Sequence, residues 1–156
     1  MSSPTPNTAA MVNGRLVQLE RGDNMVYITL TRTSSLSITT AGVTVTWQNL
    51  IDAGCAVAWS GSVITVPVSG YYSLTFNGKL STRDAVVGDI LVNGVEVATM
   101  GSGDGKDTKF RLTATRFFKV DDEIQLRLQT ATGTRTLQVT TEDSAGESPI
   151  INLVLL

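Results

Sequence analysis

The stretch ITVPVSGYYSLTFNGKL, from Ile64 to Leu80, has the pattern of a strand, a tight turn and a second strand. The turn falls at Pro67-Val68-Ser69-Gly70, where proline and glycine supply the backbone angles that a chain reversal needs. Because side chains alternate between the two faces of a strand, apolar residues at every second position predict one buried face. These residues are Tyr72, Leu74 and Phe76. Such a hairpin could be the core of an enzyme, the wall of a binding site, or a seam between identical subunits.

The rest of the chain also predicts β-structure. Threonine and valine are abundant and suit a pleated surface, and no segment shows the 3.6-residue apolar period of a helix. Asn93-Gly94 is a favoured two-residue type I′ turn between the apolar runs Ile90–Val92 and Val95–Val97. About ten short strands, with turn signals roughly every 8–12 residues, predict an all-β antiparallel sandwich or barrel.

One strand departs from strict alternation. Apolar residues occupy alternate positions at Phe110, Leu112 and Ala114, and Phe117 then falls out of phase. We therefore expect a β-bulge near Phe117.

The composition removes several kinds of chemistry. The 156 residues include no histidine, which is the commonest general base and metal ligand. The one cysteine, Cys55, lies in the apolar stretch AGCAVAW and is expected to be a buried core thiol. With 12 basic and 14 acidic residues and no basic run, the chain is not expected to bind nucleic acid. No cofactor and no metal are expected, and no residue is assigned a catalytic role.

Charged residues make up 17% of the chain, below the quarter that is usual for soluble domains, so part of the surface is expected to meet another chain. The first residues, MSSPTPNTAAMVNGR, lack the basic and apolar segments of a secretory signal. No apolar stretch approaches the roughly 18 residues that a membrane helix needs. We therefore expect no membrane partner, and synthesis in the cytoplasm without signal-peptide export.

Three segments are predicted along the chain. Residues 1–12 are polar and rich in proline, serine and threonine, and are predicted to form a flexible arm. Residues 13–41 are predicted to hold N-terminal strands that lead into a head formed by residues 42–156.

The last strand, SPIINLVLL, carries apolar residues on both of its faces. An antiparallel strand usually turns one face to water, so this one needs a second cover. A neighbouring subunit is the simplest cover, since no helix is predicted. The alternative is a central strand that loops of the same chain shield.

Four stretches in order resemble the superfamily of tumour necrosis factor and the complement q-type globular heads. They are VPVSGYYSLTFNG (66–78), DILVNGVEVA (89–98), FFKVDDEIQLRL (117–128) and INLVLL (151–156). The first stretch matches the superfamily pattern at Pro67, Gly70, Tyr71 and Tyr72, but Leu74 replaces an aromatic residue there. In the third stretch, Asp121 stands where the pattern has glycine. The resemblance covers roughly residues 43 to 156.

This resemblance implies a jelly roll of about ten strands that assembles as a homotrimer around a threefold axis. It implies a non-catalytic binding or structural module. Carried over by position, the trimer interface would comprise Tyr71, Ser73, Thr75, Ile150, Asn152, Val154 and Leu156. The sandwich core would comprise Tyr72, Leu74, Phe76, Ile151, Leu153 and Leu155.

Heads of this type without a signal peptide also occur in bacteriophage particles, as capsid decorations, head fibres or tail appendages. By that analogy we expect a structural virion protein, located in the virion, whose partners are its own copies and a capsid or tail protein. The alternative is a trimeric module that binds a carbohydrate or a receptor.

Several short motifs have a functional and a structural interpretation. Arg21-Gly22-Asp23 spells the integrin-binding tripeptide but is more typical of a polar turn, and GSGDGKD (101–107) is expected to be a surface loop rather than a phosphate loop. Trp47 and Trp59 could stack on a sugar, although their contexts favour core or seam positions. A group of acidic residues could bind Ca²⁺ or form solvated loops. These are Asp104, Asp107, Asp121, Asp122 and Glu123.

Overall fold

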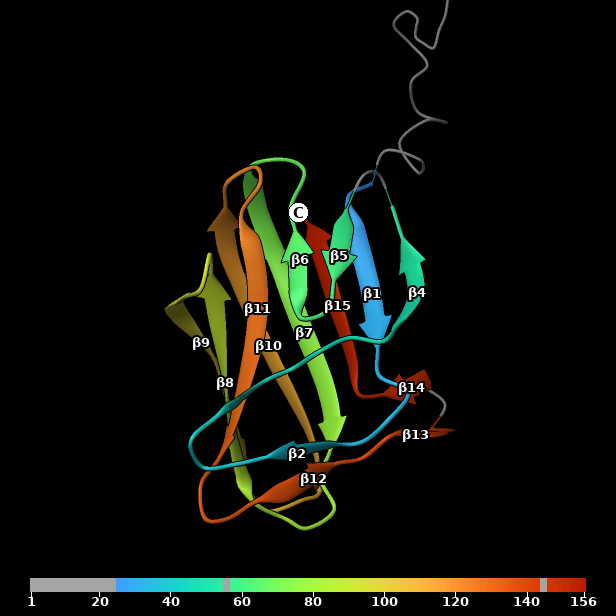
Figure 1. The fold of residues 1–156 in the computed structure, drawn as a ribbon, viewed down its shortest axis with the longest axis vertical. Coiled ribbons are helices and arrows are strands. Elements are labelled where there is room, and N and C mark those ends of the chain that lie inside the picture. Colours follow the sequence, from blue (N-terminus) through green and yellow to red (C-terminus); the bar gives the residue numbers. More distant parts are fainter. Residues whose placement is uncertain (1–24, 55–56, 144–145) are drawn as a thin grey trace, which may run out of the picture.

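A computed structural model describes residues 25–54, 57–143 and 146–156, and these segments form a two-layered antiparallel β-sandwich (Figure 1). The first sheet has five strands in the order β10-β7-β15-β1-β4. Their bounds are Lys109–Phe118 (β10), Gly70–Lys79 (β7), Ile150–Leu155 (β15), Tyr27–Thr31 (β1) and Asn49–Ala53 (β4). The segment 13–41 therefore contributes a strand, β1, to the sandwich itself.

The second sheet faces the first and has the order β5-β6-β11-β8-β9, with β3 paired to β11. Its strands are Val43–Thr44 (β3), Ala58–Ser60 (β5), Val63–Thr65 (β6), Ala85–Val92 (β8), Val95–Asp104 (β9) and Glu123–Thr130 (β11). Two short ribbons complete the described chain: β2 (Leu36–Ile38) with β12 (Arg135–Leu137), and β13 (Thr140–Asp143) with β14 (Gly146–Ser148).

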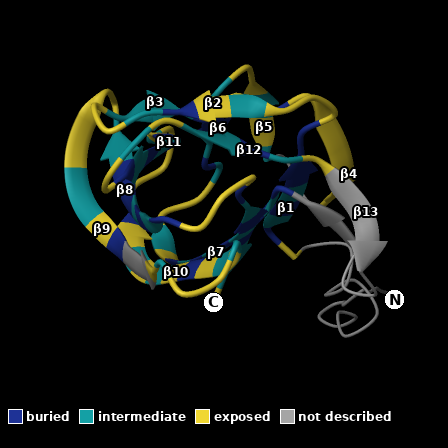
Figure 2. Cartoon of the chain, turned by 90° about the horizontal axis from the view of Figure 1, so that it is seen from below, coloured by how far each residue is buried: buried dark blue, intermediate teal, exposed yellow. Residues whose placement is uncertain are grey.

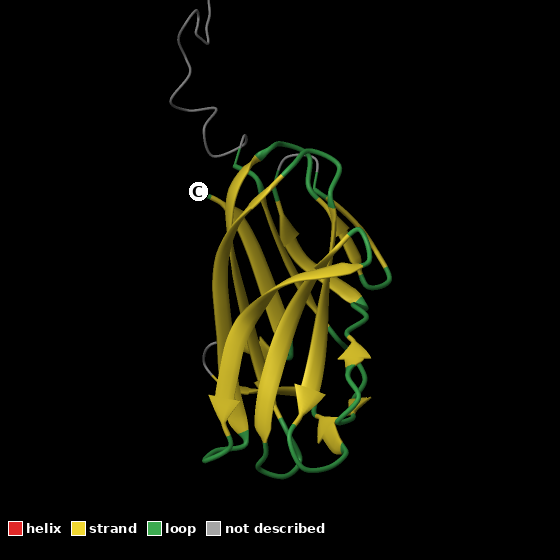
Figure 3. Ribbon diagram, turned by 90° about the vertical axis from the view of Figure 1, so that its left-hand side faces the viewer, coloured by secondary structure: helices red, strands yellow, loops and turns green. Residues whose placement is uncertain are grey.

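The described segments contain strands and loops but no helix (Figure 3), so none of these segments offers a helix that could cross a membrane. The expected all-β antiparallel sandwich is confirmed. The described residues form fifteen strand segments rather than about ten, because four short strands form the two ribbons and others, such as β3 and β5, add to the second sheet.

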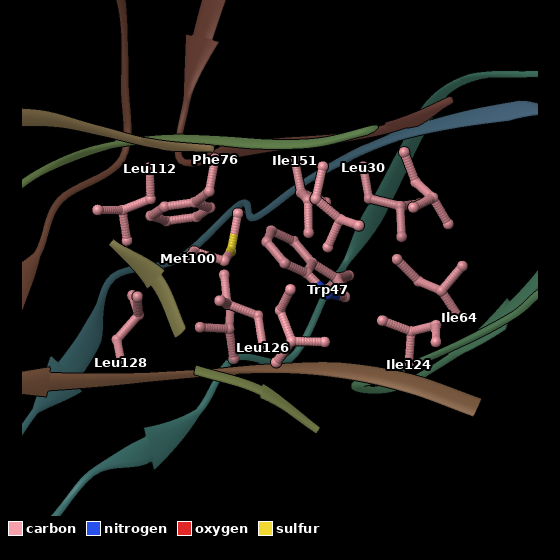
Figure 4. Close-up of a cluster of buried hydrophobic side chains, with 14 of the residues drawn as sticks. Leu30, Trp47, Ile64, Phe76, Met100, Leu112, Ile124, Leu126, Leu128 and Ile151 are labelled. Atoms are coloured by element: carbon pink, nitrogen blue, oxygen red, sulfur yellow. The ribbon is translucent and has the colours of Figure 1, made fainter. Parts of the chain in front are cut away.

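The core fills the space between the two sheets. Phe76, Leu112 and Ile151 project from the first sheet toward Leu126 and Leu128 of the second (Figure 4). Trp47, with 3% of its surface exposed, lies between the layers, and its ring meets that of Phe76 edge-on at 6.1 Å. Figure 2 shows the buried residues enclosed by the two sheets and β4 as an exposed strand at the margin.

The β8–β9 turn confirms the type I′ prediction, since Asn93 and Gly94 have φ values of 53° and 85°. The bulge expected near Phe117 is wrong: β10 pairs with β7 in unbroken register from Lys109↔Lys79 to Phe118↔Gly70. The chain keeps its alternation by placing Arg116 at an inward position, which an edge strand tolerates because a long charged side chain can reach solvent.

Two turns differ from their sequence-based interpretation. The stretch GSGDGKD is not wholly a loop, because β9 continues through Asp104 and the reversal begins at Gly105, whose φ is 79°. Asp121 adopts a φ of 72°, in the left-handed region that glycine occupies most easily. This conformation gives a physical reason for the glycine that the superfamily pattern has at this position.

Candidate functional site: the outer face of the first sheet

The candidate site is the outer face of the first sheet, meaning the side that is turned away from the sandwich core. Strand β15 lies in the middle of this sheet, between β7 and β1. In β15 and β7 the side chains alternate between buried positions and half-buried or exposed ones. The same strands that build the core therefore also build a continuous second surface.

The structure separates the two predicted sets of residues by face. Tyr72, Leu74, Phe76, Ile151 and Leu153 are buried in the core. Leu155 is half-buried and packs against the core edge. The other set lies on the outer face and is half-buried or exposed in the single chain. It comprises Tyr71, Ser73, Thr75, Ile150, Asn152, Val154 and Leu156. Its assignment to a subunit interface stays a prediction.

One end of the outer face carries a row of exposed apolar side chains, which we call the apolar row. It consists of Met25, Leu156, Tyr71 and Phe117, whose exposed fractions are 51%, 73%, 61% and 47%. Tyr71 and Phe117 are paired across β7 and β10, and their rings meet edge-on at 5.4 Å. The backbone N–H of Leu156 donates to the Tyr71 carbonyl at 2.9 Å, which places Leu156 beside Tyr71.

The middle of the outer face carries a polar row that crosses all five strands. The register aligns Asp52, Thr29, Asn152, Thr75 and Thr113. The Thr29 hydroxyl donates to the Asn152 Oδ1 at 2.6 Å, so the central amide is held from one side. Between this polar row and the apolar row lies Val154, in register with Tyr27 and Ser73.

The formal charges of the outer face lie toward the edge strands and one end of the sheet. Asp52 lies on the edge strand β4, and hydrogen bonding from the Tyr27 hydroxyl to its carboxylate raises the pKa of Tyr27. Arg111 and Lys109 lie on the opposite edge strand, β10, and Lys79 pairs with Lys109 at the end of β7. The three central strands carry no charge in the rows between Lys79 and the apolar row.

The outer face of the second sheet is of a different kind, because it carries an ion-pair network that joins three of its strands. Arg127 of β11 donates to Asp89 of β8 at 3.0 Å and also to Glu96 of β9. The hydrogen bonds that Arg127 donates to these carboxylates, first to Asp89 and then to Glu96, raise the pKa of Arg127. Asp89 is 3% exposed and also accepts a hydrogen bond from the Thr99 hydroxyl at 3.3 Å. The sequence pattern missed this network, because Asp89 stands at the start of an apolar run.

A second buried carboxylate, Asp84, organises the loop before β12. It accepts hydrogen bonds from the Thr132 hydroxyl at 3.0 Å, from the backbone N–H groups of Thr132 and Gly133, and from the Arg135 Nε at 3.2 Å. Burial raises the pKa of Asp84, but these hydrogen bonds and the arginine charge outweigh it and hold the pKa below its usual value. Each buried carboxylate thus has an arginine partner.

The structure separates the acidic residues that were considered for Ca²⁺. Asp104 and Asp107 lie before β10, whereas Asp121, Asp122 and Glu123 lie after it, at the other end of this ten-residue strand. Asp107 accepts hydrogen bonds from the backbone of Thr108 and Lys109, and Asp122 accepts from the Lys119 N–H at 2.9 Å. Within the described segments, no three acidic, cysteine or histidine residues gather as metal ligands.

The tryptophans do not form a surface platform. Trp47 is a core residue, and Trp59 is half-buried on β5 and packs against the core. An open hollow of about 500 Å³ lies elsewhere, beside the β1–β2 turn and β12, and its lining includes no aromatic residue. It is lined by Thr33, Ser34, Ser35, Lys79, Thr136, Gln138 and Val139.

Three sequence-based predictions lie outside the described residues. They concern the arm at residues 1–12, the Arg21-Gly22-Asp23 turn and the thiol of Cys55.

Solved structures share this fold. Murine APRIL in a crystal structure at pH 5.0 is 15% identical with a TM-score of 0.57, over 85% of this chain and 100% of that chain. The Eiger TNF of S. frugiperda is 13% identical with a TM-score of 0.50, over 85% of this chain and 93% of that chain. No protein-family model matches the sequence, and no curated protein matches it. The chain is therefore a TNF-like jelly-roll sandwich.

Proposed function

We propose that this chain is a homotrimeric, non-catalytic head that works by assembly, as a structural protein of a bacteriophage particle. In this proposal it decorates a capsid, or forms part of a head fibre or tail appendage. The trimer buries the outer face of the first sheet, and a capsid or tail protein of the same particle is the second partner.

The contrast between the two outer faces carries the assembly part of the proposal. The outer face of the second sheet carries the ion pairs of Arg127, in which the Glu96 side chain is 49% exposed. The first sheet instead presents the apolar row beside short, uncharged side chains on its central strands. Exposed apolar patches with polar borders are typical of surfaces that meet another protein.

The trimeric state is supported by the TNF-like fold and by the position of β15. This strand lies at the centre of the first sheet, so a partner that covers its outer face covers the middle of the sheet. Non-catalytic function is supported by the lack of histidine and by the arginine partners of Asp84 and Asp89, which suit structural carboxylates. The virion role is supported by analogy with similar heads of phage particles.

Light scattering after size exclusion tests the assembly. We expect three times the chain mass of 16.6 kDa at micromolar concentration. An obligate interface of this kind should bury on the order of 2,000 Å² or more per pair of copies. A monomer that persists at micromolar concentration would refute the proposal.

A deletion of residues 2–12 tests the virion role. This polar segment, with Pro4 and Pro6, is proposed to anchor the head by ordering on a partner surface. Three arms per trimer would act together, so weak single contacts could hold firmly. We expect the shortened chain to form a normal trimer that mass spectrometry no longer detects in purified particles. Incorporation at the normal level would show that the arm is not the anchor.

The alternative function, a carbohydrate- or receptor-binding trimer, has one observation in its favour. The hollow beside the β1–β2 turn is lined by hydroxyl groups, an amide and Lys79, which are groups that bind sugar hydroxyls or an acidic ligand. Glycan-array binding that disappears in Lys79→Ala, with the trimer intact, would favour this alternative.

A further inference from the structure

Two opposite charges lie at opposite edges of the outer face of the first sheet. Asp52 is exposed on β4, and Arg111 is exposed on β10. The five-strand order puts four strand spacings of about 4.8 Å between these edges, or roughly 19 Å in all. The two side chains are therefore too far apart to pair within one chain.

Neither charge has an ionic partner within the part of the chain that the structure describes. The Asp52 Oδ1 accepts a hydrogen bond from the Ala53 N–H at 2.9 Å. Arg111 lies opposite the neutral Asn77, with the lysine pair Lys79 and Lys109 in the next row. Within the described residues, each charge therefore lies on the outer face without a partner of opposite charge.

The two charges also lie at nearly the same height along the strands. Asp52 belongs to the polar row, whose last member on β10 is Thr113. Arg111 is two residues from Thr113, or about 7 Å along the strand, a distance that an arginine side chain can span. A second copy related by rotation about an axis parallel to the strands keeps this height, so an edge-to-edge contact would bring its Arg111 beside Asp52.

We propose that Asp52 of one copy pairs with Arg111 of the next, so that the β4 edge of each subunit meets the β10 edge of its neighbour. This inference rests on the proposed homotrimer and names the contact that orients it. Edge-to-edge contacts between like edges would oppose two carboxylates or two guanidinium groups, and such contacts are disfavoured.

Charge reversal tests the pair. Asp52→Arg and Arg111→Asp are made singly and together in the full-length chain, and the concentration at the midpoint of trimer dissociation is measured by light scattering. If each contact is weakened about fivefold, three contacts lower the assembly constant about a hundredfold. For a trimer this raises the midpoint concentration about tenfold in either single variant, whereas the double variant should return to the wild-type midpoint.

The expected weakening should shrink at high salt, because salt screens exposed charges. Glu123→Arg, an equal charge reversal on β11 of the second sheet, is the matched control and should leave the midpoint unchanged. Circular dichroism of each variant checks the fold. Asp52→Asn and Arg111→Gln replace any variant that does not fold, and each should weaken assembly by a smaller factor.

The outcomes separate the pair from the trimer. A wild-type chain that is monomeric at every accessible concentration overturns the proposed function and the pair together. A stable wild-type trimer with unchanged midpoints in both single variants overturns the pair and leaves the trimer standing. The same holds if both single variants weaken the trimer and the double variant does not recover.

Discussion

Replacing Val154 by aspartate tests whether the outer face of the first sheet is buried between copies. Val154 lies on the central strand β15, in register with Tyr27 on one side and Ser73 on the other. Its side chain points away from the core, so the substitution leaves the packing between the two sheets untouched. We expect the single chain to fold and the assembly to fail.

The expected loss is about 3 kcal/mol for each copy. Removing a valine from a buried contact costs about 1.5 kcal/mol, and placing a carboxylate in a partly dehydrated seam costs at least a similar amount. Three copies bring the loss to about 9 kcal/mol per trimer. Because a trimer forms with the third power of the monomer concentration, its midpoint should rise by roughly three decades.

Val87→Asp is the matched control, because Val87 is also half-buried but lies on the outer face of the second sheet, opposite Gln129. We expect Val87→Asp to remain a trimer and Val154→Asp to elute as a monomer or to precipitate. Light scattering on a dilution series measures both, and circular dichroism reports whether the chain is folded. A Val154→Asp trimer with an unchanged midpoint and melting temperature would refute the orientation that we assign to this face.

Three further predictions concern single residues. Asp84→Asn should lower the free energy of unfolding by about 2 kcal/mol at pH 7. Because the pKa of Asp84 is depressed in the folded chain, the difference from wild type in urea unfolding should shrink as the pH falls below about 4. A difference of the same size at pH 3 would contradict an ionised carboxylate. Asp121→Gly should stabilise the chain by about 0.5 kcal/mol, since relief of the left-handed φ exceeds the added chain entropy, and a lower melting temperature would refute the strain. Trp47→Ala should lower the free energy of unfolding by about 3–5 kcal/mol because the ring is buried, and a small change would contradict its core role. Because this variant disturbs the core, only Trp59→Ala can test sugar stacking.

Local patterns predicted the parts of the fold that depend on neighbours in sequence. The period-two alternation of β7 separated Tyr72 from Tyr71 correctly, because adjacent strand residues must face opposite sides. The Asn93-Gly94 turn was predictable for a similar reason, since its positive φ values require these residue types. The break expected at Phe117 failed because a polar residue, Arg116, holds an inward position at an edge strand.

The rest of the structure depends on contacts between distant residues. Asp89 and Arg127 are 38 residues apart, and only the pairing of β8 with β11 brings them together. The placement of β15 between β7 and β1 likewise joins residues from three distant parts of the chain. A period in one strand identifies its faces but carries no information about which strand lies beside it, so the polar row could not be found from the sequence.

The two outer faces show how one set of strands can specify both a fold and an assembly. On the second sheet, long charged side chains such as Arg127 and Glu96 join neighbouring strands and present charge to water. On the outer face of the first sheet, apart from Tyr27, Tyr71, Lys79 and Ile150, the central strands carry serine, threonine, asparagine and valine, whose short side chains let a neighbouring backbone come close. A partner can approach such a face closely. The unpaired charges Asp52 and Arg111 lie at opposite edges, so like charges avoid each other only when the β4 edge of one copy meets the β10 edge of the next. The residues that face inward along β7 and β15 therefore determine the sandwich, and the alternate residues of the same strands determine what can cover it.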